Sequence, residues 1–330
     1  MAPESWKIRL SHYSYTMFDE CQRRWLYRYA CDHFPAPMKW ALKKQAKLSA
    51  WETTAGKVVD LTVSHALRKY KERGAWPENL PELGLKVLEC LERYSRWWVE
   101  QVGAGMRWPH NDYYGPIDRH YYGEEITEQE RQKCRDKIVA CLSAFRDAGP
   151  ADTAVELGVE HWDGPRAPSE YAPTFTVRGV DVWASYDFAI RTPEITYIVD
   201  WKTGRFTEHS HQRALDQLHW YALYADIEWR VPVEQIRVVP VWLSDDASWQ
   251  PAAVCARSLE ELAERIRERY DLLISKVRLT PEDHVSEEGW LPAKSSAYCR
   301  RCQFRGACTA KDSVPGAEKE DDYGWPEDAE

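Results

Sequence analysis

The chain has 330 residues, which is enough for one large domain or two ordinary ones with a sizeable core. Its formal net charge of −9 argues against a uniformly basic nucleic-acid-binding protein, and its hydrophobic content of 44% is ordinary for a globular protein. No apolar run approaches the roughly 20 residues of a membrane span, and residues 1–10 lack the apolar core of a signal peptide, so we expect a cytoplasmic protein without a membrane partner.

The first half of the chain is predicted to be helical. Apolar residues recur at helical spacing in several stretches that are separated by segments rich in glycine and proline. The local charge is positive at the start, because residues 1–75 hold 14 Lys or Arg against 7 Asp or Glu. The predicted helices cover 11–29, 53–70, 83–99 and 127–148, with a break at 74–81 and a loop over 103–123.

Strands are predicted only after residue 150. Alternating or continuous apolar runs indicate strands, and two charged amphipathic stretches indicate further helices. The fold class is therefore α/β, with an N-terminal helical region that precedes the strands. The predicted strands cover 154–162, 171–177, 180–190, 195–201 and 236–243, and the helices cover 212–226 and 259–276.

We expect a single domain over 1–312 and an acidic tail over 313–330. The tail after Gly316 holds seven acids and one lysine, a composition that predicts disorder. Within the domain we expect an N-terminal helix with a cysteine, a helical segment, the sheet core, and a final helix followed by a cysteine cluster. These parts cover 1–50, 51–150, 151–250 and 251–312.

The stretch Ile198–Gly204 reads as a short buried strand that ends in a polar turn. Residues two apart in a strand share a face, so Asp200 and Lys202 point one way and Val199 and Trp201 point the other. Burial of a carboxylate and an ammonium at the end of an apolar strand is costly without partners or a function. A structural ion pair is the alternative interpretation.

Neighbouring segments add further polar groups to this strand end. A turn near Pro193 predicts a hairpin that places Asp187 close to Asp200 and Lys202. Two carboxylates repel each other and favour a hard divalent cation such as Mg²⁺ or Mn²⁺. A lysine beside them supplies positive charge where a phosphate oxygen would sit. Gln217 and Tyr221 share one face of the next helix.

Three motifs follow one another here, namely Asp187, Asp200-Trp201-Lys202-Thr203-Gly204 and Gln217-x-x-x-Tyr221. Their order and spacing resemble those of the PD-(D/E)xK nuclease superfamily, and more closely those of its RecB-type members. The resemblance implies a restriction-endonuclease-like fold, which is a mixed central sheet flanked by helices, and metal-dependent phosphodiester hydrolysis. It also implies that Asp187, Asp200 and the backbone carbonyl of Trp201 bind the metal. Lys202 would position or activate the attacking water, and Gln217 and Tyr221 would orient the site and the DNA.

The RecB-type family also carries an upstream G-x-x-x-H helix motif whose histidine joins the metal site. Here the stretch is Gly56-Lys57-Val58-Val59-Asp60, so Asp60 stands at the histidine position. An aspartate is still an oxygen ligand for a hard cation. His65 is the alternative, but five residues of helix separate it from Asp60, so the two cannot both face the site. Glu160 is expected on the preceding strand as a supporting residue.

The cysteine spacing near the C-terminus is C-x2-C-x5-C, formed by Cys299, Cys302 and Cys308. Metal sites usually take four such ligands, and Cys21 on the first helix is the natural fourth. This set resembles the iron–sulfur variant of the same family, including Cas4-like nucleases, and implies a structural [4Fe–4S] cluster that staples the two ends of the domain. Zinc is the alternative metal. Arginines beside these cysteines are candidate DNA contacts, namely Arg23, Arg24, Arg300 and Arg301.

The resemblance implies a metal-dependent DNA nuclease, an exonuclease acting on single strands or DNA ends. The alternative is a catalytically inactive DNA-binding or assembly subunit built on the same fold. The chain has no G-x-x-x-x-G-K-[ST] motif and therefore no ATP-driven motor of its own. We therefore expect a helicase, or a partner in CRISPR adaptation or repair, to accompany it.

Overall fold

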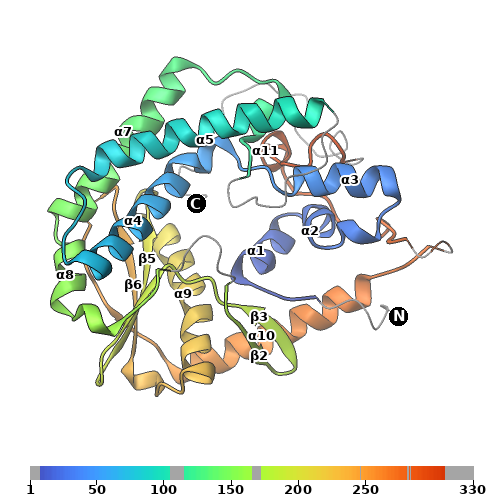
Figure 1. Ribbon diagram of the computed structural model, residues 1–330. Helices are drawn as coiled ribbons and strands as arrows, with labels where there is room; N and C mark the ends of the chain where they lie inside the picture. The colour runs from blue at the N-terminus through green and yellow to red at the C-terminus, as the bar shows by residue number, and fades with distance from the viewer. Residues whose placement is uncertain are drawn as a thin grey trace.

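A computed structural model describes residues 8–104, 115–165, 172–245, 247–280, 282 and 284–308 of the chain. Its centre is a five-stranded mixed sheet with the order β1-β4-β5-β6-β7 (Figure 1). Neighbours in this sheet are antiparallel except β5 and β6, which run parallel. A separate antiparallel hairpin is formed by β2 and β3. The strands are β1 (Trp162–Asp163), β2 (Thr174–Val177), β3 (Val180–Trp183), β4 (Phe188–Arg191), β5 (Thr196–Lys202), β6 (Ile236–Trp242) and β7 (Ala252–Ala253).

Helices cover the sheet and build two hydrophobic cores. One core joins α4, α5, α7 and α8 to one face of the sheet, and the other joins α1, α2, α9, α10 and the β2–β3 hairpin to the opposite face (Figure 1). The helices are α1 (His12–Glu20), α2 (Gln22–Tyr29), α3 (Ala36–Gln45), α4 (Thr54–Arg73), α5 (Leu80–Gly103), α6 (Asp118–Tyr122), α7 (Glu128–Asp147), α8 (Pro150–Glu156), α9 (Glu208–Glu228), α10 (Ala256–Lys276) and α11 (Ser296–Arg300). The predicted fold class, a mixed sheet flanked by helices after an N-terminal helical region, is confirmed.

Strand β5 lies at the middle of the sheet and divides the two cores. Val199 and Trp201 belong to the core under α4 and α7, where the Trp201 ring lies 5.2 Å from the ring of Phe145 in an edge-to-face contact. Ile198 belongs to the opposite core beneath α9. The predicted alternation of this strand is confirmed, and it turns Asp200 and Lys202 toward α9.

The predicted helix over 11–29 is interrupted at Cys21. The backbone of Cys21 is extended, with φ −159° and ψ 108°, so that α1 ends and α2 begins there. The Cys21 thiol accepts a hydrogen bond from the Arg24 backbone N–H at 3.4 Å and so caps α2. Helical periodicity continues across this residue, which explains why the break was not visible in the sequence.

Three other sequence predictions are wrong. The expected strand over 154–162 is helix α8 followed by a short 3₁₀ turn at Val159–His161, because Gly149 and Pro150 start a helix and β1 begins only at Trp162. The expected strand over 180–190 is two strands in different sheets, β3 and β4. The expected loop over 103–123 contains helix α6.

The predicted tail over 313–330 lies outside the described residues. No described helix combines the length and the apolar character that crossing a membrane requires.

Candidate active site

The polar groups at the end of β5 form a closed hydrogen-bonded set. Asp200 is 3% exposed, and the Lys202 Nζ atom lies 2.6 Å from its Oδ2 atom. Lys202 also donates a hydrogen bond to Gln217 Oε1 at 2.7 Å, and Gln217 Nε2 donates to Asp200 Oδ1 at 3.3 Å. The Gln217 amide reaches the Tyr221 hydroxyl at 3.0 Å, one turn further along α9. Residues from β5 and α9 therefore fix the position of both the lysine and the carboxylate.

Asp187 joins this set from the other strand of the hairpin. It precedes β4, whose first residue Phe188 is opposite Val199 of β5. The Asp187 Oδ2 atom accepts a hydrogen bond from the Trp201 backbone N–H at 3.2 Å. The hairpin thus brings the two carboxylates together as the sequence predicted, although Asp187 lies before β4 and not near the end of one long strand.

Burial and neighbouring carboxylates raise the pKa values of Asp187 and Asp60. Burial raises the pKa of Asp187 well above its ordinary value, and the nearby carboxylates of Asp200 and Asp60 raise it further, whereas Lys202 and the Trp201 N–H oppose the rise. Burial and then the Asp200 carboxylate raise the pKa of Asp60 from 3.8 to about 6. A cluster of carboxylates whose ionisation is opposed in this way suits a hard divalent cation with oxygen ligands.

Asp60, rather than His65, faces these carboxylates from helix α4. The pKa of His65 is lowered by burial and by Arg68, Lys69 and other charges of its own helix, with no contribution from the carboxylate cluster. Glu160 does not lie on a strand and is not in the cluster. Its side chain is 75% exposed in the 3₁₀ turn before β1, where it lies 3.5 Å from His161.

One residue beside the lysine, His12, was not identified from the sequence. Burial, followed by the charges of Lys202 and Arg213, lowers the pKa of His12 to about 4. The His12 ring lies 6.2 Å from the ring of Trp220 in an edge-to-face contact. No spacing rule could connect the first turn of α1 with β5, because only the packing of α1 against α9 brings them together.

The raised pKa of Asp60 predicts a pH dependence of stability in metal-free protein. A carboxyl whose pKa is raised by folding destabilises the folded state when ionised, so stability is lost as pH rises from about 4 to about 6. The rise corresponds to roughly 3 kcal/mol. We expect the Asp60→Asn variant to gain up to about this amount over the parent above pH 6, and nothing below pH 4.

Urea unfolding in EDTA across this pH range measures the difference between the two proteins. The exposed Asp136→Asn variant of α7 is the matched control for loss of an aspartate. A constant offset between Asp60→Asn and the parent at all pH values would contradict the proximity of Asp60 to Asp200.

The four cysteines singled out in the sequence line one cavity between α2 and the C-terminal segment. Cys21, Cys299, Cys302 and Cys308 all contribute to its wall. Burial raises the pKa of Cys302 to about 11, and it also raises the pKa values of Cys21 and Cys299, with a smaller contribution from the neighbouring cysteines. Cys302 Sγ accepts a hydrogen bond from the Phe304 N–H at 3.4 Å. As positioned, no three His, Cys, Asp or Glu side chains within the described ranges form a group that could hold one metal ion.

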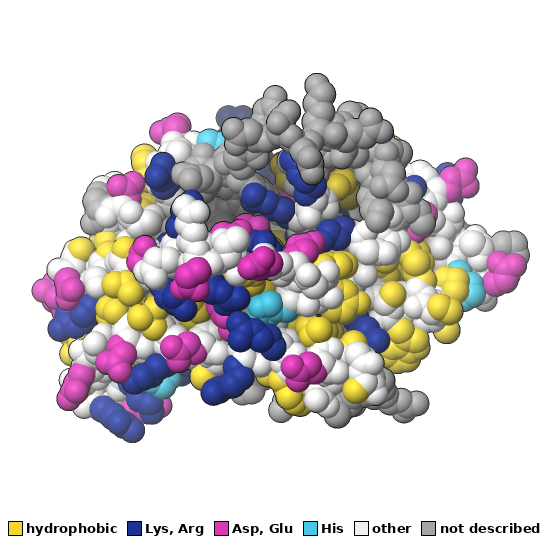
Figure 2. Space-filling model, turned by 90° about the horizontal axis from the view of Figure 1, so that it is seen from above, with side chains coloured by type: hydrophobic (Ala, Val, Ile, Leu, Met, Phe, Trp, Pro, Cys, Tyr) yellow, Lys and Arg dark blue, Asp and Glu magenta, His cyan; other side chains and the backbone are white. Residues whose placement is uncertain are grey.

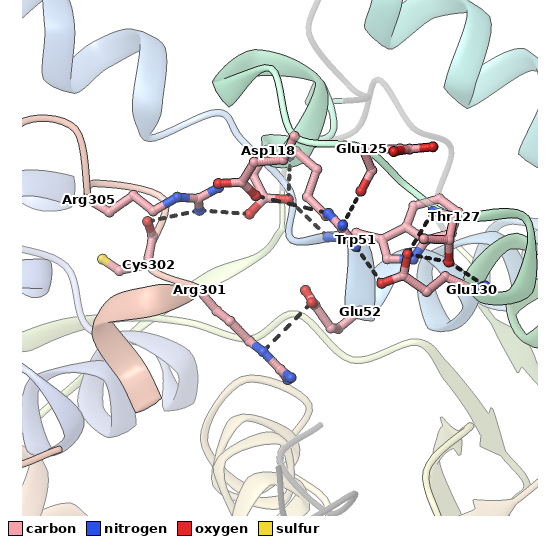
Figure 3. Close-up of polar contacts among 11 residues, drawn as sticks. Trp51, Glu52, Asp118, Glu125, Thr127, Glu130, Arg301, Cys302 and Arg305 are labelled. Atoms are coloured by element: carbon pink, nitrogen blue, oxygen red, sulfur yellow. Dashed lines mark hydrogen bonds and ion pairs between the residues drawn. The ribbon is translucent and has the colours of Figure 1, made fainter. Parts of the chain in front are cut away.

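A buried ion pair ties the cysteine segment to the start of helix α4 (Figure 3). Asp118, which is 2% exposed, accepts a hydrogen bond from Arg305 Nη1 at 3.0 Å and from the Trp51 backbone N–H at 3.1 Å. Arg305 stands midway between Cys302 and Cys308, and its guanidinium carbon lies 3.8 Å from the centroid of the Tyr122 ring. The segment before α4, and with it the helix that carries Asp60, is therefore anchored to the cysteine segment.

The arginines expected to contact DNA are largely paired with carboxylates. Arg23 lies 3.0 Å from Glu287, and Arg24 lies 3.3 Å from Glu20. Figure 3 shows Arg301 directed toward Glu52, at 3.7 Å. The surface coloured in Figure 2 likewise carries intermingled basic and acidic side chains. A phosphate contact by Arg23, Arg24 or Arg301 would have to compete with these carboxylates. Arg300 is exposed at the end of α11.

The remaining cysteines lie apart from this cavity. Cys134 and Cys141 are buried in the core of α7, and Cys90 and Cys255 are exposed. Cys31 is half-buried beside the opposite core.

The comparison with protein families agrees with the geometry of the site. Residues 9–309 match the model of the PD-(D/E)XK nuclease superfamily, a range that includes every carboxylate, lysine and cysteine discussed above. No curated protein matches the chain. Because the match covers most of its length, the chain belongs to the PD-(D/E)XK nuclease superfamily.

Proposed function

We propose that the protein is a metal-dependent DNA nuclease that acts as an exonuclease on single strands or DNA ends. The observation that carries the proposal is the convergence of Asp187, Asp200 and Lys202 at one end of β5, held by Gln217 from α9. Superfamily membership points to phosphodiester hydrolysis with DNA as the substrate. The exonuclease mode and the RecB-type, Cas4-like grouping rest on the sequence resemblance alone.

The donor set fits Mg²⁺ or Mn²⁺. Magnesium is usually held by one or two carboxylates, with water and substrate phosphate completing its coordination, so a group of three protein ligands is not required. Asp187 and Asp200 would supply the carboxylates, with the Trp201 carbonyl and Asp60 as further oxygen donors. When bound, the metal would polarise the phosphodiester and favour ionisation of a coordinated water.

Lys202 has two tasks in this proposal. Its ammonium donates a hydrogen bond that orients the attacking water, and its charge stabilises the negative charge that accumulates on the phosphoryl oxygens. The water oxygen forms the new bond to phosphorus while the bond to the leaving oxygen breaks. The Gln217 amide keeps the ammonium in place through its bond to Nζ, and Tyr221 holds that amide in turn.

Cleavage of end-labelled DNA tests this function. Purified protein should release mononucleotides or short fragments from one end of single-stranded DNA with Mn²⁺ or Mg²⁺, and EDTA should stop the release. Circular single-stranded DNA is the matched substrate without ends, and its rapid cleavage would show an endonuclease instead. Binding without cleavage across several divalent metals would favour the inactive DNA-binding subunit.

For the cysteines we propose a structural [4Fe–4S] cluster. All four thiols line one cavity, and four cysteine thiolates are the usual ligand set of such a cluster. The N–H donors to the sulfurs of Cys21 and Cys302 are of the kind that accompanies such clusters.

We expect anaerobically purified protein to be brown, with about four irons per chain, as a four-iron cluster requires. The Cys302→Ser variant should lose the colour, because a buried ligand is removed. The Cys31→Ser variant, whose thiol does not line the cavity, should keep it. A colourless protein with one zinc per chain would contradict the cluster.

A further inference from the structure

A second cleft lies at the opposite end of β5 from Asp200 and Lys202. It has a volume of about 600 Å³ and is open to solvent. Thr196, the first residue of β5, lies in its wall, together with the end of α4, the segment around β1, the β4–β5 turn and the connection from α9 to β6. A volume between roughly 300 and 1,000 Å³ is typical of a site for a small molecule. Because it lies at the other end of β5, the cleft is distinct from the proposed catalytic centre.

The lining carries positive charge that the protein itself does not neutralise. Lys71 donates a hydrogen bond to the Trp162 carbonyl oxygen at 2.7 Å, which leaves its charge uncompensated. Arg191 lies 3.5 Å from Asp163, so these two charges offset each other. In the described part of the chain, neither Lys71 nor Arg230 pairs with a carboxylate.

Glu160 is the remaining acid of the lining. The Glu160 Oε1 atom lies 3.5 Å from the His161 Nε2 atom. The cleft thus holds three permanent cations against two acids, and the two unpaired cations come from α4 and from the loop after α9.

Arg230 has a backbone conformation that is unusual for a residue with a side chain. Helix α9 ends at Glu228, and the Val231 N–H donates a hydrogen bond to the Ala225 carbonyl at 3.2 Å, across a seven-residue turn that ends the helix. Arg230 occupies the left-handed position of that turn, with φ +55°. Glycine usually fills this position, because a side chain there strains the backbone. The backbone geometry therefore does not account for an arginine at position 230, whereas a function of its exposed side chain does.

We propose that the cleft binds the phosphate of a nucleotide, with Arg230 and Lys71 as the contacting cations. A guanidinium presents two parallel donors to phosphate oxygens, and an ammonium adds a third donor. Arg191 forms a fixed wall, because its guanidinium carbon lies 4.5 Å from the centroid of the Trp229 ring. Thr196 and Gln235 offer neutral polar groups to the rest of the ligand. The phosphate belongs either to a free mononucleotide or to the terminal nucleotide of a strand.

The decisive variant is Arg230→Gly. It relieves the strained backbone, so the variant should unfold at the same temperature as the parent or a higher one, yet its phosphate affinity should fall about tenfold or more. Arg178→Gly is the matched control, because Arg178 also has a positive φ, of 48°, but lies in the β2–β3 turn outside the cleft. The control should bind like the parent. Lys71→Met is a second variant that removes a cleft cation from a regular helix.

Binding is measured by calorimetry in EDTA, so the result does not depend on cleavage. The two probes are dAMP and a 5′-phosphorylated trinucleotide. Binding of dAMP that is lost in Arg230→Gly and Lys71→Met identifies a free-nucleotide site. Binding of the trinucleotide alone, lost in the same variants, identifies a strand-end site. The proposal is overturned if the parent binds neither probe, or if both cleft variants bind like the Arg178→Gly control.

Discussion

Replacing Lys202 with alanine should lower the rate of DNA cleavage about 10³-fold while DNA binding stays close to that of the parent. The ammonium is the one cation within hydrogen-bonding distance of Asp200 among the ion pairs of the described site, and Gln217 holds it in place. It contributes little to substrate affinity in this proposal, because a phosphodiester is contacted along a longer surface. Its effect falls on the transition state, where negative charge on the phosphoryl oxygens increases.

A second consequence separates this prediction from simple misfolding. The Lys202 charge opposes the rise in the pKa of Asp187, so its removal should raise that pKa further and weaken Mn²⁺ binding near neutral pH. Single-turnover cleavage, filter binding in EDTA and Mn²⁺ titration measure the three effects. Lys133→Ala, on the exposed face of α7, is the control for loss of a surface cation. Cleavage by Lys202→Ala at the parental rate would show that the assignment of this site is wrong.

The positions of the proposed catalytic residues at the end of β5 could be predicted because the relations among them are local. Asp200 and Lys202 share a face through the two-residue period of a strand, and a short hairpin returns Asp187 to them. Gln217 and Tyr221 share a face through the helical period. Each of these relations spans few residues, so sequence spacing alone determines the geometry. Asp60 was harder, because its approach to Asp200 depends on how α4 packs over the sheet.

The parts that the sequence did not reveal depend on contacts between distant segments. Cys21 interrupts a helix whose apolar period continues, because its thiol turns toward a cavity formed by residues some 280 positions later. Asp118 lies in a stretch that reads as loop, and its buried partner Arg305 comes from the opposite end of the chain. His12 meets the charge of Lys202 only through packing. No local pattern encodes such pairs.

Replacing Asp118 with alanine should destabilise the protein by about 3 to 5 kcal/mol, the usual cost of leaving one member of a buried ion pair without its partner. Arg305 would keep Glu124, at 2.9 Å, but that carboxylate is far more exposed than Asp118. The backbone N–H groups of Trp51 and Arg119 would also lose their acceptor. Unfolding in guanidinium chloride, with the four cysteines unchanged, measures the loss in the free energy of unfolding.

The double variant Asp118→Leu with Arg305→Met distinguishes the ion pair from the shape of this region. Hydrophobic residues of similar volume often replace a buried pair at little cost, so the double variant should recover much of the stability lost in Asp118→Ala. It should not recover the anchoring of α4, because leucine cannot accept the Trp51 N–H bond that Asp118 provides. We therefore expect weaker Mn²⁺ binding through Asp60 in a protein of nearly parental stability. Equal Mn²⁺ affinity in the double variant and the parent would show that the cysteine segment stabilises the fold without positioning the helix that carries Asp60.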